Sequence, residues 1–136
     1  MHETNIENVR AGLAGKKIFL MPYCHADHAW CHTREWHVRR YSEALRCALA
    51  LYSSQPDFRY FVDSWSEFLK PCLESSPDLL PKVREAVQSG KLALVGGHWS
   101  NIRFGHVGDE TSIRNMIHGR RAMAENFPHA RLDAYA

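Results

Sequence analysis

The chain has 136 residues, a length that suits one domain around a single hydrophobic core. Hydrophobic residues make up 45% and charged residues 24%, a balance that excludes a globally disordered chain. The net charge of +2 creates no strong field for nucleic acid or a membrane surface, so neither is an expected partner.

No apolar run approaches the roughly 20 residues that a membrane helix needs. Residues 1–15 are polar and predict an N-terminal tail or short helix, without the apolar stretch of a signal peptide. The four cysteines, at positions 24, 31, 47 and 72, form no CxxC pair. Free thiols in a reducing cytoplasm are therefore expected, and with them a cytoplasmic protein.

Apolar periodicity and turn residues divide residues 16–136 into alternating strands and helices. Strands are predicted at 16–23, 58–62, 91–95 and 130–136; helices are predicted near 34–53, over 77–89 and over 109–126, with a short one opening at a Ser64–Glu67 capping box. Strands separated by helices run parallel through right-handed crossovers. The order predicts an α/β fold, either a doubly wound sheet or part of a barrel.

Polar clusters follow two of these strands. The first strand ends in His25-Ala26-Asp27, and the third ends in Gly96-Gly97-His98-Trp99. Ligands collect at the carboxyl ends of parallel strands, so a site is expected there. His25 and Asp27 lie two residues apart and face the same side of an extended chain. An imidazole nitrogen and a carboxylate oxygen together supply half of a zinc site.

Each of these residues also has a plain structural explanation. An HxD pair at a strand end often consists of surface residues that only hydrogen-bond each other, and Trp30 fits a core position as well as a stacking platform for a sugar. Gly96-Gly97 suits a tight turn with positive φ. His28 and His32 have helical spacing but precede the predicted helix.

Several separated segments resemble glycoside hydrolase family 38, the α-mannosidases. Residues 25–30 (HADHAW) match the family's HxDxxW motif, and residues 95–99 (VGGHW) are similar to its GGxW element. Weaker likenesses follow the same order, at 55–61 (QPDFRYF), 79–92 (LLPKVREAVQSGKL) and 108–121 (GDETSIRNMIHGRR). The resemblance covers roughly residues 16 to 136, as one partial N-terminal domain after the tail at 1–15.

The resemblance implies the first part of a seven-stranded β/α barrel and a zinc-dependent retaining glycosidase acting on α-mannosides or related glycosides. It implies His25 and Asp27 as zinc ligands and Trp30 as a residue of the sugar pocket, with a carbohydrate as the partner. The nucleophile of the family falls just past Ala136, and its acid/base carboxylate and last zinc histidine have no place in the sequence. We therefore expect an N-terminal fragment, inactive alone, whose open sheet edge promotes homo-oligomers.

The pattern departs from the family after GGxW, where Ser100-Asn101-Ile102-Arg103 stand in place of acidic residues. Two alternatives stay open. One is a metal-dependent barrel similar to carbohydrate deacetylases, for which His28 and His32 would have to face the same metal. The other is a non-catalytic carbohydrate-binding or interaction domain, which the missing acidic residues favour.

Overall fold

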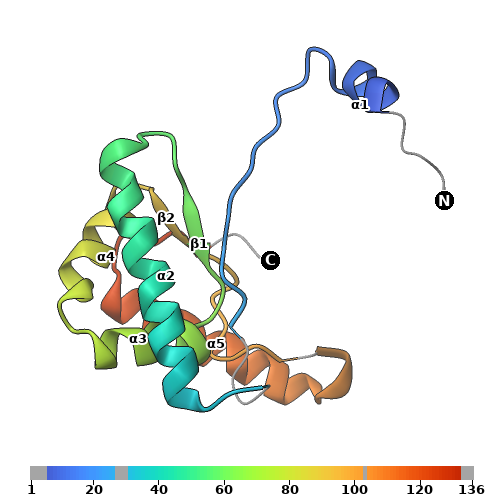
Figure 1. Cartoon of the computed structure of the whole chain (residues 1–136). Coiled ribbons are helices and arrows are strands. Elements are labelled where there is room, and N and C mark those ends of the chain that lie inside the picture. The colour runs from blue at the N-terminus through green and yellow to red at the C-terminus, as the bar shows by residue number, and fades with distance from the viewer. Residues whose placement is uncertain (1–5, 27–30, 103, 133–136) are drawn as a thin grey trace.

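A computed structural model describes residues 6–26, 31–102 and 104–132. The elements follow in the order α1 (Ile6–Leu13), α2 (Arg34–Ser54), β1 (Tyr60–Val62), η1 (Trp65–Leu69), α3 (Lys70–Ser75), α4 (Leu79–Gln88), β2 (Leu92–Leu94), η2 (Phe104–His106) and α5 (Asp109–Asn126). Figure 1 shows α2, α3, α4 and α5 gathered around the two strands, while α1 lies at the end of an extended segment that leads away from them. The mixed α/β architecture agrees with the sequence prediction.

The two strands are parallel, as predicted, and pair Tyr60 with Leu92 and Val62 with Leu94. Helix α4 lies between them in the chain and ends where Gly90 takes a φ of +70°. Strand residues alternate between buried and less buried positions, so each strand presents one face to the core.

Helix α2 confirms the helix predicted near 34–53. Thr33 caps it by accepting a hydrogen bond of 3.3 Å from the backbone N–H of Trp36. Its buried side chains recur every three or four residues, so one stripe of the helix faces the core. That stripe contains His37, Tyr41, Leu45, Ala48 and Tyr52.

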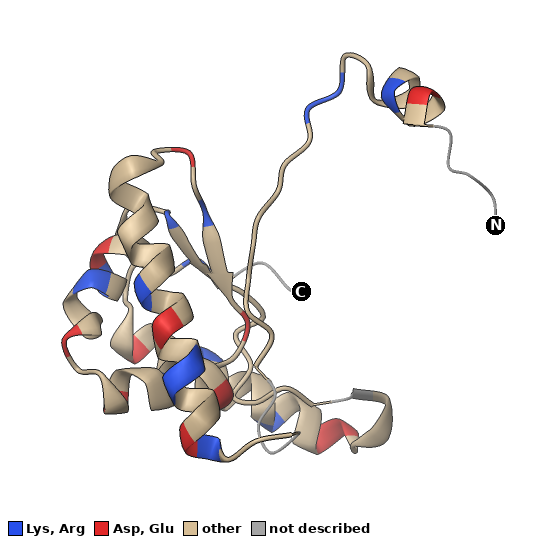
Figure 2. Ribbon diagram, viewed as in Figure 1, with Lys and Arg blue, Asp and Glu red and all other residues tan. Residues whose placement is uncertain are grey.

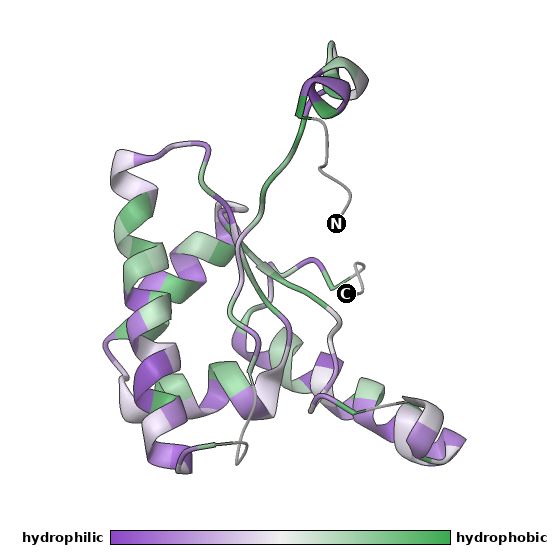
Figure 3. Ribbon diagram, turned by 45° about the vertical axis from the view of Figure 1, so that its right-hand side comes forward, coloured by the Kyte–Doolittle hydropathy of each residue, from purple (hydrophilic) through white to green (hydrophobic). Residues whose placement is uncertain are grey.

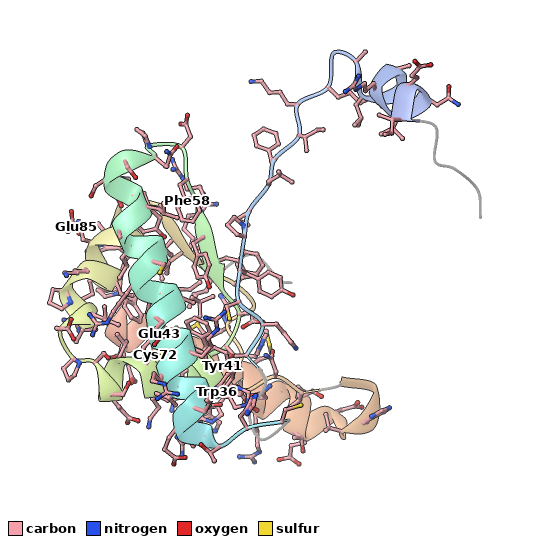
Figure 4. All side chains as sticks on the ribbon, viewed as in Figure 1. Trp36, Tyr41, Glu43, Phe58, Cys72 and Glu85 are labelled. Carbon is pink, nitrogen blue, oxygen red and sulfur yellow. The ribbon has the colours of Figure 1, made fainter. Side chains whose placement is uncertain are left out.

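The core lies between the strands and the surrounding helices. Phe68 is fully buried and stacks on Tyr41 of α2, with ring centroids 5.2 Å apart. Cys72 of α3 is also fully buried, and its Sγ lies 3.9 Å from the carbonyl oxygen of Val38 (Figure 4). The other fully buried apolar side chains are Leu45, Val62, Leu69, Leu79, Val83, Leu92, Leu94 and Met123.

Charged residues of both signs are interspersed along the helices (Figure 2). The Arg46 guanidinium of α2 forms two hydrogen bonds with Asp78, of 2.7 and 2.9 Å, and ties α2 to the start of α4. These bonds hold the pKa of Asp78 below its ordinary value. Within the described part of the chain, no helix is both long and apolar enough to cross a bilayer.

The predicted strand over 16–23 is wrong as a buried strand in this structure. Only Tyr23 pairs with the sheet, through a single parallel bridge to Phe61. Phe19 and Leu20 are 87% and 88% exposed, and the extended segment that contains them leads away from the strands toward α1 (Figure 3). A strand is buried only when elements cover its faces, and the described residues supply no such cover.

Two further expectations need correction. The Ser64–Glu67 capping box does not form, because η1 is a wide π-helical turn in which Leu69 donates to the carbonyl oxygen of Ser64, five residues back. Ser64 is buried instead of capping, and Glu67 accepts from the Ser66 hydroxyl. Residues 130–132 form no strand, and the rest of the predicted strand at 130–136 lies outside the described residues. The described residues form a two-stranded sheet and do not show a seven-stranded barrel.

Candidate functional site

Three chain segments end at the same edge of the sheet. Residues 24–26 follow the Tyr23 bridge, Asp63 follows β1, and the turn at 95–99 follows β2. Since all three segments run parallel, these are their carboxyl ends, where α/β folds bind ligands. We call the residues at this edge the strand-end site.

An imidazole and a carboxylate meet in the strand-end site. His25 Nδ1 lies 3.7 Å from Asp63 Oδ2, with the His25 side chain 56% exposed and the Asp63 side chain 10% exposed. The other carboxylate oxygen, Asp63 Oδ1, is buried and has no hydrogen-bond partner among the described residues. A buried, unsatisfied carboxylate oxygen is costly and marks a position that a donor or a cation would satisfy.

The turn after β2 approaches the same aspartate. Gly96 and Gly97 take φ values of +82° and +61°, the left-handed region that glycine adopts without strain. A Cβ on Gly96 would lie 2.6 Å from the His98 ring and 3.6 Å from the backbone oxygen of Asp63. The predicted tight glycine turn with positive φ is confirmed, and the missing Cβ leaves room for the His98 ring against Gly96.

Helix α5 contacts this turn through its backbone. The Trp99 backbone N–H donates to the carbonyl oxygen of Asn115 at 3.0 Å, and the Trp99 carbonyl accepts from the N–H of Ser66 at 2.8 Å. A Cβ on Gly119 would lie 2.1 Å from the His98 carbonyl carbon, so the helix and the turn are in backbone contact. His98 is buried, and its Nε2 lies 2.8 Å from Asn101 Oδ1.

Trp99 borders a surface hollow of about 380 Å³. Its side chain is 38% exposed, and Ile102, Arg114 and His118 line the same hollow. An aromatic face beside hydrogen-bonding groups suits a sugar ring. A larger hollow of about 640 Å³ lies between α2 and α3, away from the strand-end site, and charged side chains dominate its wall.

The predicted site residues are only partly placed. His25 lies at the strand-end site with the Gly96–Trp99 turn, whereas Asp27, Trp30 and His28 lie outside the described residues. His32 is exposed and its ring contacts that of Trp36 at the start of α2, with centroids 4.0 Å apart and the ring planes tilted by 31°. Asp63 was missed by sequence analysis; the available signal was its position as the first polar residue after an alternating strand.

The donors in the strand-end site suit zinc by type. Imidazole nitrogen and carboxylate oxygen are both preferred ligands, and Asp63 Oδ1 has unused acceptor capacity. Burial raises the pKa of the neighbouring Cys24 thiol, which favours its protonated form. Among the residues that the structure describes, no three His, Cys, Asp or Glu side chains group closely enough to hold a metal ion. A zinc site here needs Asp27 or further donors.

Parallel strands, a helical crossover and polar residues gathered at the strand ends define an α/β domain with a candidate ligand site at one edge of its sheet. Comparison with known families shows to which family this α/β domain belongs. Residues 15–134 match the family described as glycosyl hydrolases family 38 N-terminal domain. The chain belongs to this family, and the resemblance inferred from its motifs is confirmed.

Two curated relatives agree with this assignment. Alpha-mannosidase G of Dictyostelium discoideum is 22% identical over 111 residues, which cover 82% of this chain and 10% of the relative. A Halalkalibacterium halodurans protein, assigned provisionally as a mannosylglycerate hydrolase, is 26% identical over 106 residues, covering 76% of this chain and 12% of the relative. The chain thus spans about a tenth of the length of these relatives.

Two solved structures from Enterococcus faecalis share the fold. One is a protein in glycosyl hydrolase family 38, with a TM-score of 0.64, and the other is an alpha-mannosidase from strain V583, with a TM-score of 0.67. Both are 24% identical in sequence; the matches cover 85% of this chain, and 13% and 12% of the two structures. At this identity the likeness shows the fold alone.

Proposed function

We propose that this chain supplies the N-terminal part of the zinc and sugar site of a retaining glycosidase that acts on α-mannosides or related glycosides. The observation that carries the proposal is the approach of His25 to Asp63 at the strand-end site, in a chain of this family. The names of both curated relatives refer to mannosyl compounds, which supports a mannosyl group as the recognised sugar.

His25 and Asp27 are the proposed zinc ligands. The half-exposed imidazole of His25 is accessible from solvent, as a ligand to a substrate-binding metal must be. Residues two apart in an extended chain face the same side, so the sequence pattern predicts that Asp27 faces the same side as His25. When bound, zinc supplies a Lewis acid that holds sugar hydroxyls. Trp30 is the proposed stacking surface for the sugar ring.

Retaining hydrolysis needs two carboxyl groups about 5–5.5 Å apart, a nucleophile and an acid/base. We assign neither to a residue of this sequence. Asp63 is mostly buried, so it is a poor nucleophile for a glycoside. We therefore propose that the residues of this chain bind and orient the sugar without cleaving it, and that the two reacting carboxyl groups come from other parts of a protein of the relatives' length.

Metal content tests this proposal. Two ligands bind zinc weakly, so the purified chain should take up zinc with low affinity, and Asp27→Ala and His25→Ala should each abolish that uptake. Asp57→Ala is the matched control, because Asp57 is an exposed aspartate in the turn before β1. In a protein of the relatives' length, Asp27→Ala should remove both tight zinc and cleavage of an aryl α-mannoside.

Two outcomes contradict the proposal. One is equal zinc in the wild type and in Asp27→Ala; the other is cleavage of the aryl α-mannoside by a protein that contains no zinc. Mannoside binding that survives Asp27→Ala unchanged would favour the alternative of a non-catalytic carbohydrate-binding domain, to which Ser100 and Asn101 also point.

A further inference from the structure

We infer that Asp63 is a positioning residue that orients the imidazole of His25, accepting from Nδ1–H so that Nε2 faces the ligand. This inference rests on the proposed function, in which His25 binds a metal. It adds a residue that lies outside the HxDxxW motif and comes from a different strand.

Strand register brings the two side chains together. Tyr23 pairs with Phe61 in parallel, and their rings stack with centroids 4.4 Å apart. Two residues further along each segment, the side chains return to the same face, which places His25 beside Asp63. The Tyr23 ring also meets the His25 ring edge-on, at 6.4 Å. The register that stacks Tyr23 on Phe61 therefore also places His25 beside Asp63.

The contact between Asp63 and His25 involves the Nδ1 side of the imidazole ring. Asp63 Oδ2 faces Nδ1 rather than Nε2 of His25, at 3.7 Å, which is longer than a hydrogen bond, so the inferred bond requires the exposed imidazole to move toward Asp63. Histidines that bind metals usually donate their other ring N–H to a carboxylate or a carbonyl, which fixes the tautomer and the ring orientation. Asp63 is suited to this role because it is largely buried and held at the end of β1.

Burial of the Asp63 carboxylate also favours its contact with the His25 imidazole. Asp63 Oδ1 has no hydrogen-bond partner in the described part of the chain, and a carboxylate with few partners is costly to bury. A protonated Nδ1 beside Oδ2 reduces that cost. The pair is thus favoured before any metal binds, which allows a test on the metal-free protein.

The first experiment measures the tautomer of His25 by long-range ¹H–¹⁵N NMR on the metal-free chain, with histidines labelled and the His25 signal assigned from His25→Gln. The wild type should show Nδ1 protonated. Asp63→Asn should keep this tautomer, because an amide oxygen still accepts, whereas Asp63→Ala should shift the ring toward the Nε2–H form. Ser64→Ala is the matched control and should change nothing, because it removes a neighbouring buried hydroxyl that has no hydrogen-bond partner among the described residues. An unchanged tautomer in Asp63→Ala would overturn the inference.

The second experiment titrates Zn²⁺ and Co²⁺ into the same variants, with thermal melting followed by circular dichroism to verify folding. Asp63→Ala should weaken metal affinity about 10–100-fold, and Asp63→Asn should weaken it less. The Co²⁺ absorption spectrum should keep its shape in both. If both variants abolish binding as Asp27→Ala does, Asp63 is a ligand and the positioning role is wrong. If His25→Gln binds metal as tightly as the wild type does, the proposed function is wrong. The tautomer measurement then still tests whether Asp63 pairs with His25.

Discussion

The Asn115 side chain exchanges two hydrogen bonds with the backbone of Ser100. The Ser100 N–H donates to Asn115 Oδ1 at 2.9 Å, and Asn115 Nδ2 donates to the Ser100 carbonyl oxygen at 2.8 Å. The Asn115 amide thus makes the two hydrogen bonds that a neighbouring strand would make, and both backbone groups of Ser100 have a partner. Helix α5 thereby fixes the chain that leaves the strand-end site.

Asn115→Ala should destabilise the chain by about 2 kcal/mol, because it leaves a backbone donor and a backbone acceptor of Ser100 without partners. Urea unfolding gives this free energy. The control is Asn126→Ala, whose amide donates to the Ala122 carbonyl oxygen in its own helix, and which should cost less than about 1 kcal/mol. Equal losses in the two variants would contradict a specific role for Asn115.

Gly119→Ala should destabilise the chain strongly although alanine is the better helix former by about 1 kcal/mol. The new Cβ would lie 2.2 Å from the Trp99 backbone nitrogen, so α5 and the turn have to separate. Gly12→Ala is the matched control, because Gly12 lies in α1 with nothing within 4 Å. The melting temperature should fall for Gly119→Ala and stay unchanged for Gly12→Ala. An equal or raised melting temperature for Gly119→Ala would show that α5 does not approach the backbone of Trp99 closely.

Stability should fall as the pH rises from about 9 to about 11. Burial raises the pKa of Cys72 from 9.0 to about 11 in the folded chain, so the thiolate forms more readily after unfolding. The stability that the neutral thiol provides is complete below the unfolded pKa and is lost through this window, about 2–3 kcal/mol in all. Burial also raises the pKa of Tyr52 to about 12, which extends the decline.

Urea unfolding at pH 8, 10 and 11 in reducing buffer measures this slope. Cys72→Ala should flatten it between pH 9 and 11, although it lowers stability at pH 8 by leaving a cavity. Cys47→Ala is the control and should keep the wild-type slope, since Cys47 is exposed. A Cys72→Ala variant with the full wild-type slope would assign the decline to other groups.

The apolar stretch before the Tyr23 bridge should drive self-association. Phe19 and Leu20 are almost fully exposed, and an extended segment with exposed apolar side chains promotes association between chains. Sedimentation velocity should show oligomers that grow with concentration in the wild type and decline in a Phe19→Ser, Leu20→Ser double variant. Ile113→Ser changes an exposed isoleucine on α5 and should have no such effect. A wild type that stays monomeric at high concentration would refute this expectation.

The sequence by itself determined the elements whose signals are local. The Thr33 cap and the apolar stripe of α2 depend on residues within one helix, and Gly90 ends α4 with a conformation that glycine alone favours. β1 and β2 were predictable as parallel because a helix separates them in the chain. The HxDxxW and GGxW motifs identified the family because their residue types and order are specific.

Only the tertiary structure decided which residues meet. Burial of residues 16–23 depends on neighbours that a local pattern does not contain, so the predicted strand is reduced to one bridge at Tyr23. The Ser64–Glu67 capping box does not form, because Ser64 is buried at the start of a wide π-helical turn. Asp63 reaches His25 through the register of two segments nearly forty residues apart, and Gly119 meets the turn through the approach of α5. Such contacts follow from packing between elements, and hydrophobic periodicity records which face of an element is buried but not what covers it.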